Sequence, residues 1–127
     1  MTCFWDGILK KLTNNDFKKI KTKKPNNKNF VLLLKKNNTQ ETKNIKWNGE
    51  TLTDNQIKEN YEHIKDFNVK SIRNGYLCST CDPFLILVCK LFNVNIYHKY
   101  CGHLMKYEVD NPNRTLHFKS NRGHFST

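Results

Sequence analysis

The chain has 127 residues, of which 37% are hydrophobic, 12% aromatic and 26% charged. This length and apolar content suit one compact domain, residues 1–127, and exclude a disordered, collagen-like or coiled-coil protein. The most apolar stretch, Leu77 to Ile96, contains Asp82, Pro83 and Lys90. It therefore lacks the roughly 20 consecutive apolar residues that a membrane span needs.

The formal net charge is +11, with 22 Lys and Arg against 11 Asp and Glu. Lys and Asn are abundant and Ala is absent, a composition typical of an AT-rich genome such as that of a large DNA virus. Ten lysines between Lys10 and Lys36 share that stretch with a single acid, Asp16. A solvated surface explains this cluster without a partner, and an anionic partner is the alternative.

Cysteine usage bears on location and chemistry. The first residues contain no apolar segment of a secretory signal, so we expect an intracellular, cytoplasmic protein, in the host cytoplasm if the source is viral. Its five cysteines should then be reduced. An odd number of reduced cysteines favours a thiol nucleophile or a metal site over a disulfide framework.

The first half of the chain predicts short helices and polar loops. Apolar residues at helical spacing predict a helix from Phe4 to Leu12, beginning directly after Cys3. A second short helix is expected over Asp16 to Ile20. The apolar run Phe30 to Lys35 indicates a buried element that is either helix or strand, and Asn37 to Lys46 is expected to be a polar loop.

Two later helices carry clear start signals. Thr53, with a Gln three positions later, forms a capping-box pattern that predicts a helix from Asp54 to Asp66. Asp82 followed by Pro83 predicts the start of a nearly all-apolar helix, Phe84 to Phe92. This second helix should lie at the centre of the core.

The C-terminal part predicts strands. Three segments rich in β-branched and aromatic residues are Val94 to Tyr100, Leu104 to Val109 and Thr115 to Ser120. Helices first and adjacent strands last indicate an α+β protein. We expect helices packed on a small, mostly antiparallel C-terminal sheet, arranged as an antiparallel meander.

Cys3 is the best-placed candidate nucleophile. It precedes the first predicted helix, whose N-terminal N–H groups favour negative charge on a thiolate and on a nearby oxyanion. Cys89 falls inside the apolar helix and is expected in the core. A thiolate needs a His partner, and only His124 lies beyond the last predicted strand. Structural or surface roles are expected for His63, His98 and His117, and the role of His103 is open.

Several segments together resemble the ovarian-tumour (OTU) type cysteine proteases, which cleave ubiquitin or related modifiers from other proteins. In that family a Cys followed by aromatic or apolar residues opens a helix, as in Cys3 to Ile8 here. A Gly-containing loop, an acid and an apolar helix resemble Gly75 to Phe92, and an N-x-x-I strand resembles Phe92 to Tyr97. The last strand, Thr115 to Ser120, is followed by His and an aromatic, as in His124-Phe125.

The resemblance implies a papain-like OTU fold and a thiol-dependent deubiquitinase that needs no cofactor or metal. Cys3 would attack the carbonyl after the modifier's C-terminal Gly, and His124 would transfer the proton. The backbone around Thr2 and Cys3 would hold the oxyanion. The position two residues after His124, often an acid in the family, is Ser126. The third catalytic member stays open between Asn121, Asp6 and a dyad without one.

The resemblance also places the substrate between two loops, with a monomer acting on ubiquitin or a ubiquitin-like protein and on no membrane. The first loop runs from Asn74 to Asp82 and the second from Asn121 to Gly123. The expected substrate-binding residues are Asn74, Gly75, Tyr76, Asp82, Asn121, Arg122 and Gly123.

Two alternatives come from other functional classes. Cys78 and Cys81 have the spacing of a zinc knuckle, and Cys101 and His103 would complete four ligands. A basic nucleic-acid-binding module would need aromatic and basic residues together on one surface. The sequence favours this second alternative less, because the densest Lys segment is poor in aromatics. The residues that suit it are Tyr97, Lys99, Tyr100, Lys106 and Tyr107.

Overall fold

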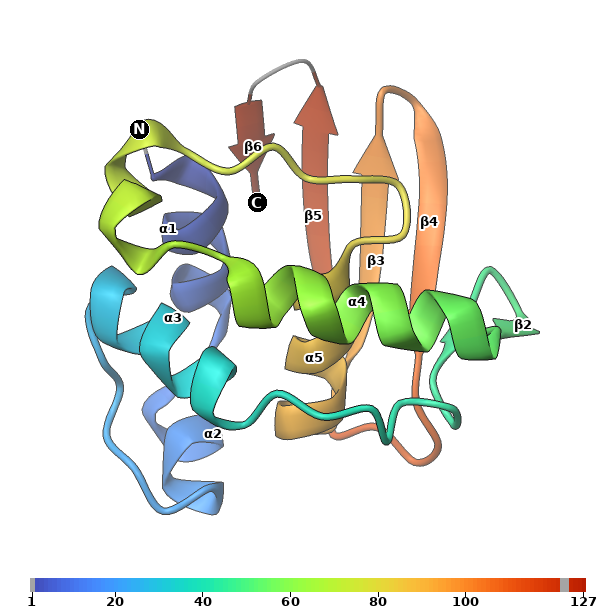
Figure 1. The fold of residues 1–127 in the computed structure, drawn as a ribbon, viewed down its shortest axis with the longest axis horizontal. Coiled ribbons are helices and arrows are strands. Elements are labelled where there is room, and N and C mark those ends of the chain that lie inside the picture. Colours follow the sequence, from blue (N-terminus) through green and yellow to red (C-terminus); the bar gives the residue numbers. More distant parts are fainter. Residues whose placement is uncertain (1, 122–123) are drawn as a thin grey trace.

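A computed structural model describes residues 2–121 and 124–127 (Figure 1). Three helices come first: α1 (Cys3–Lys11), α2 (Asn14–Lys19) and α3 (Asn27–Lys36). The short strands β1 (Lys46–Trp47) and β2 (Glu50–Thr51) precede α4 (Asp54–Asp66), the 3-10 helix η1 (Val69–Asn74) and α5 (Pro83–Phe92). Four more strands follow: β3 (Asn95–Tyr100), β4 (His103–Glu108), β5 (Thr115–Asn121) and β6 (His124–Ser126).

The predicted helix starts of α4 and α5 are confirmed. The Thr53 side chain accepts from the Gln56 N–H at 3.1 Å, and the Gln56 side chain accepts from the Thr53 N–H at 2.9 Å. The Asp82 carboxylate accepts from the Phe84 N–H at 2.9 Å, with Pro83 in the first turn of α5. Both caps satisfy N–H groups that have no partner within a helix.

The N-terminal helices differ from the prediction in two details. The run Phe30 to Lys35, which the sequence left open between helix and strand, lies in α3. The side chain of Asn26 caps this helix. The second helix begins at Asn14 instead of Asp16, because Thr13 and Asp16 form a capping box there.

The sheet has six strands in the order β2-β1-β4-β3-β5-β6. Four neighbouring pairs are antiparallel, but β3 and β5 are parallel, with Tyr97 opposite His117. The prediction of an antiparallel meander is therefore wrong, although the α+β class is confirmed. The outer edge of β4 already pairs with β1, through Lys46 and Glu108, so β5 takes the free edge of β3.

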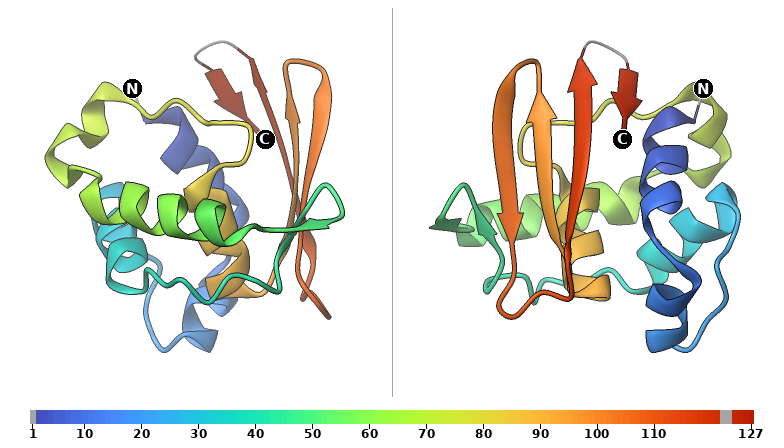
Figure 2. Two further views of the ribbon diagram at one scale, coloured as in Figure 1. Left: turned by 45° about the vertical axis from the view of Figure 1, so that its right-hand side comes forward. Right: turned by 180° about the vertical axis from the view of Figure 1, so that it is seen from behind.

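All the helices lie on one face of the sheet (Figure 2). Alternation along the strands turns Ile96 of β3, Tyr107 of β4 and Phe118 of β5 toward them, and all three are buried. The opposite face of the sheet is uncovered within the described residues. The sheet therefore has a core side and an open side.

The predicted central helix, α5, occupies the core. Eight of its ten residues are buried, and its side chains contact both the sheet and α4. Around its start the rings of Trp5 and Phe84 meet at 4.9 Å, and those of Tyr76 and Phe84 at 5.2 Å. Each such buried ring contributes about 1.5–3 kcal/mol relative to exposure. No described helix has the length and apolar character needed to cross a bilayer.

An ion pair between the half-buried Arg114 and the buried Asp16 fixes the first helices to the beginning of β5. The guanidinium of Arg114 donates to both carboxylate oxygens of Asp16, at 2.6 and 2.5 Å, and to the carbonyl of Lys11 at 2.7 Å. Burial alone would raise the pKa of Asp16, but the hydrogen bonds from Arg114 and Thr13 lower it. This pair fixes α1 relative to the sheet, which decides where Cys3 lies.

Candidate active site

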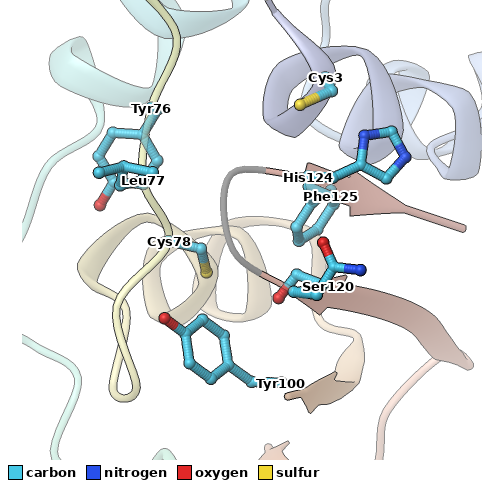
Figure 3. Close-up of a pocket in the computed structure, with 9 residues that line it drawn as sticks. Cys3, Tyr76, Leu77, Cys78, Tyr100, Ser120, His124 and Phe125 are labelled. Carbon is cyan, nitrogen blue, oxygen red and sulfur yellow. The ribbon is translucent and has the colours of Figure 1, made fainter.

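Cys3 and His124, which lie near opposite ends of the sequence, line the same small pocket (Figure 3). Cys3 and His124 form one side of it, the segment from Tyr76 to Cys78 forms the other, and Ser120 and Tyr100 lie below. The pocket has a volume of about 30 Å³, which leaves room for only a few water molecules. Its lining residues are Cys3, Tyr76, Leu77, Cys78, Tyr100, Ser120, Asn121, His124 and Phe125.

Cys3 is half-buried and is the first residue of α1. The preceding residue, Thr2, makes no side-chain cap; instead its hydroxyl donates to the Asp6 carboxylate at 2.8 Å. The first-turn N–H groups of α1 are thus not used by the side chain of Thr2. Such N–H groups attract negative charge, on a thiolate or on a developing oxyanion.

His124 is exposed and lies in β6, a three-residue edge strand, and not on a loop as the sequence led us to expect. The next residue, Phe125, is buried and anchors the strand. Its ring lies 4.9 Å from the rings of both Phe4 and Phe118. The backbone of Gly7 in α1 leaves room for this ring, since a Cβ at Gly7 would lie 2.8 Å from it. The Gly7–Phe125 contact therefore sets the position of His124 relative to Cys3.

A second, wider hollow borders the same pair of residues. It has a volume of about 270 Å³ and lies against α1 and the end of β6. Cys3, His124 and Phe125 line both hollows, so the pair stands where the two meet. No hydrogen bond joins the Cys3 thiol to the His124 imidazole among the described residues. In unliganded thiol enzymes such contacts are often long and tighten only when substrate binds.

The two residues left open as a third catalytic member lie in different places. Asn121 is directly opposite His124 in the β5–β6 register and lines the narrow pocket. Side chains directly opposite in an antiparallel pair lie on the same face of the sheet. The Asp6 carboxylate instead accepts from Thr2 and, at 2.6 Å, from the Asn27 amide.

The loop before α5 is held by Asp82, whose carboxylate is completely buried. It accepts from the Tyr76 hydroxyl at 2.8 Å and from the Ser79 N–H at 3.0 Å, besides capping α5. Burial raises the pKa of Asp82, and these hydrogen bonds oppose that rise. The Asp82 side chain therefore positions the loop and offers no surface to a substrate.

The other predicted substrate-binding residues divide into three groups. Tyr76 and Asn121 line the narrow pocket. Asn74 and Gly75 lie at the end of η1, outside the lining, where Gly75 has a φ of +86° that favours glycine. Arg122 and Gly123 lie outside the described residues.

A second Cys-His pair lies beneath the first. The thiol sulfur of Cys78 is 3.8 Å from Nδ1 of His98, and Nε2 of His98 is 2.5 Å from the hydroxyl of Ser120. Burial lowers the pKa of His98 to about 4, so the ring is neutral at pH 7. The sequence predicted a structural or surface role for His98 and did not predict this cluster, which depends on the pairing of β3 with β5.

Cys89 is buried and Cys78 and Cys81 are half-buried, and burial affects the pKa of all three thiols. Burial raises the pKa of Cys78, an effect that the nearby Asp82 carboxylate reinforces. Burial also raises the pKa of Cys81 to about 11 and raises that of Cys89. These three thiols stay protonated at neutral pH and are therefore poor nucleophiles. Cys3 is half-buried, and Cys101 is exposed at the turn between β3 and β4.

The proposed zinc ligands do not come together. Within residues 2–121 and 124–127, no group of three His, Cys, Asp or Glu side chains could share a metal ion. Cys78 contacts His98, whereas Cys101 and His103 are exposed at the turn between β3 and β4.

Comparison with known proteins adds no further constraint. No protein-family model, curated protein or solved structure matches the chain.

Proposed function

We propose that the chain is an OTU-type cysteine protease that hydrolyses the bond after the C-terminal Gly of ubiquitin or a ubiquitin-like modifier. The observation that supports this most is the meeting of Cys3 and His124 at one pocket, from the two ends of the sequence. The OTU resemblance uses these same two residues. The order of a Cys-bearing helix, a buried apolar helix and a final strand with His agrees with it.

In the proposed reaction the Cys3 thiolate attacks the carbonyl carbon of the terminal Gly, and a C–S bond forms. The negative charge that develops on the carbonyl oxygen is stabilised by N–H groups at the start of α1. The C–N bond then breaks, and the His124 imidazolium gives its proton to the departing Lys amine. Water attacks the resulting thioester with His124 as base, which releases the modifier's carboxylate and restores the thiol.

The two hollows suit the two sides of the scissile bond. A pocket of about 30 Å³ between the Tyr76 loop and Asn121 admits a chain only where it lacks side chains, as a glycine tail does. The hollow of about 270 Å³ on the other side of the pair has room for a lysine side chain as leaving group. Lys10 and Asp6 line this wider hollow and would meet the acceptor protein.

Asn121 is the residue we propose to orient His124. It lies opposite His124 on the neighbouring strand, and its amide is a suitable partner for an imidazole N–H. Such a residue acts by fixing the tautomer and direction of the ring. Its loss should therefore slow the reaction without abolishing it.

The test is reaction with ubiquitin carrying a C-terminal electrophile. The intact chain should form one covalent adduct, and Cys3→Ala and His124→Ala should form none. Cys78→Ala is the matched control, because Cys78 lines the same pocket but is held as a thiol. Failure of the folded chain to react with ubiquitin and ubiquitin-like probes would overturn the proposal, as would an adduct that survives in Cys3→Ala.

A further inference from the structure

The open face of the sheet carries an ordered set of basic and aromatic side chains. Six outward-facing residues of the three central strands make up this set, which we call the outer array. All but the half-buried Tyr97 are exposed. It consists of Tyr97 and Lys99 on β3, Leu104 and Lys106 on β4, and His117 and Lys119 on β5.

Strand pairing arranges these residues in two rows. Tyr97 lies between Lys106 and His117, and Lys99 lies between Leu104 and Lys119. The Lys106 ammonium is 5.4 Å from the centre of the Tyr97 ring. The Tyr97 and His117 rings are perpendicular, with their centres 5.7 Å apart. In this arrangement the edge of one ring points at the other, so that ring leaves both its faces free of the other ring.

A hollow deepens the second row at the end of the sheet. Lys99 and Lys119 stand on its sides, and its volume is about 380 Å³. Its lining includes Gly102, whose φ is +86° and where a Cβ would meet no atom within 4 Å besides those of its chain neighbours. Backbone that is this open, between two ammonium groups, suits an anion such as a phosphodiester.

Lysine charge outnumbers acidic charge on this face, where β4 also carries one acid, Glu108. Three lysines lie on it, and the nearest acid, Glu108, accepts a hydrogen bond from the Tyr97 hydroxyl at 3.1 Å. The acids Asp16 and Asp82 are buried on the core side of the fold. A polyanion approaching this face therefore meets positive charge across all three strands.

We propose that the outer array binds single-stranded nucleic acid. Bases stack on the rings of Tyr97 and His117, and phosphates lie at Lys99, Lys106 and Lys119. Lysines alone would serve an acidic protein equally well, but aromatic rings set among lysines on an open sheet serve bases. The outer array differs from the basic and aromatic residues that the sequence suggested for such a site. Two of those, Tyr107 and Tyr100, are excluded because Tyr107 is buried and Tyr100 faces the narrow pocket.

The inference does not depend on the proposed protease activity, since none of the six residues touches the catalytic pocket. Of the residues around the hollow, only Ser120 and Asn121 are shared with that pocket. Nucleic-acid binding should therefore survive Cys3→Ala.

The charge component is tested by the salt dependence of binding. Fluorescence anisotropy of labelled single-stranded DNA and RNA of about 12 nucleotides should show binding at about 50 mM salt that weakens steeply with added salt. In Lys99→Gln/Lys119→Gln the slope of log K against log salt should fall by about 1.4, since each phosphate contact contributes about 0.7. The ratio of the affinities for DNA and RNA then shows which of the two nucleic acids the face prefers.

A matched control distinguishes binding at this face from a general effect of the protein's net charge. Lys23 and Lys24 are exposed and line a different hollow of about 420 Å³ beside α3. Lys23→Gln/Lys24→Gln removes the same charge and should leave the salt slope unchanged. An equal loss in both double variants, or no binding at about 50 mM salt, would overturn the proposal.

The stacking component is tested at Tyr97. Tyr97→Leu should weaken binding about tenfold, whereas Tyr97→Phe keeps the ring and should bind like the parent chain. Circular dichroism should show that each variant folds, as expected for residues outside the core. If Tyr97→Leu binds normally and polyglutamate competes as well as the oligonucleotide, the face is a site for acidic proteins and the proposal is wrong.

Discussion

Cys3 and His124 line one pocket, and a second Cys-His pair, Cys78 and His98, reaches it only through Cys78. Cys3 and His124 stand at the rim, on a helix start and an edge strand. Cys78 and His98 lie at the floor, where His98 is fully buried and bonded to Ser120. The same two types of side chain thus occur close together in opposite environments.

The difference shows that environment, and not residue type, selects the nucleophile. Burial and the Asp82 carboxylate raise the pKa of Cys78, and burial lowers the pKa of His98, so the floor pair stays neutral. The rim pair has the N-terminal N–H groups of α1 beside it and a hollow on either side. The floor pair shapes the pocket, and the rim pair is the one to which we assign the proposed chemistry.

Thiol labelling should give the largest contrast between the pairs. In a Cys101→Ser chain at pH 7, iodoacetamide should modify Cys3 on the order of 100-fold faster than Cys78, because only a thiolate reacts. Peptide mass spectrometry measures both rates in the same sample. In urea the two should react alike, and equal rates in the folded chain would contradict the assignment.

Gly7→Ala should break the rim pair while leaving the floor pair intact. The added methyl would lie 2.8 Å from the Phe125 ring, so β6 must shift and His124 with it. We expect a probe reaction on the order of tenfold slower, and an unfolding free energy lower by about 1–2 kcal/mol. At an unhindered helical position the same change would instead stabilise by about 1 kcal/mol.

Gly49→Ala is the control that distinguishes a displaced His124 from a general loss of stability in the Gly7→Ala experiment. Gly49 has a φ of +82° and open space around it, so its loss costs about 1 kcal/mol of strain far from the pocket. Its probe reaction should match that of the parent chain. A normal reaction in Gly7→Ala, measured by adduct formation over time, would show that β6 docks without this contact.

The burial of His98 in the floor pair should make the free energy of unfolding fall at acidic pH. The pKa of His98 is about 4 in the folded chain and about 6.5 when unfolded, so protons bind the unfolded state more tightly. Stability is complete above pH 6.5 and falls as the pH drops toward 4, by about 2 kcal/mol at pH 5. Urea unfolding at pH 7 and 5 measures this loss.

The control for the acid effect is another histidine of the same sheet. His117 is exposed on the outer face, so His117→Gln should keep the full loss at low pH. His98→Gln should lose most of it, although its stability at pH 7 will be lower. If His98→Gln shows the same fall between pH 7 and 5, another group is responsible.

How much the sequence could predict depended on how local each signal was. The capping box of α4 and the Asp82-Pro83 start of α5 lie within four residues, and both were correct. The parallel pairing of β3 with β5 was missed because it depends on β1, a two-residue strand that occupies the edge of β4. Strands this short carry no periodic pattern to recognise.

The same division applies to the site. Cys3 was chosen as candidate nucleophile because a helix was expected directly after it, which is a local feature, and Cys3 is the first residue of α1. Asp82 was expected at the substrate but is buried, because capping and the Tyr76 hydrogen bond both draw it inward. The Cys78–His98–Ser120 cluster joins a loop and two strands, so its existence depends on a register that no single segment encodes.

Because the thiol and the imidazole come from opposite ends of the sequence, the pair exists only after the last strand has docked on the first helix. A ribosome makes Cys3 well before His124, with strands β1 to β5 between them in the sequence. A nascent or truncated chain would hold a thiol but no base facing it.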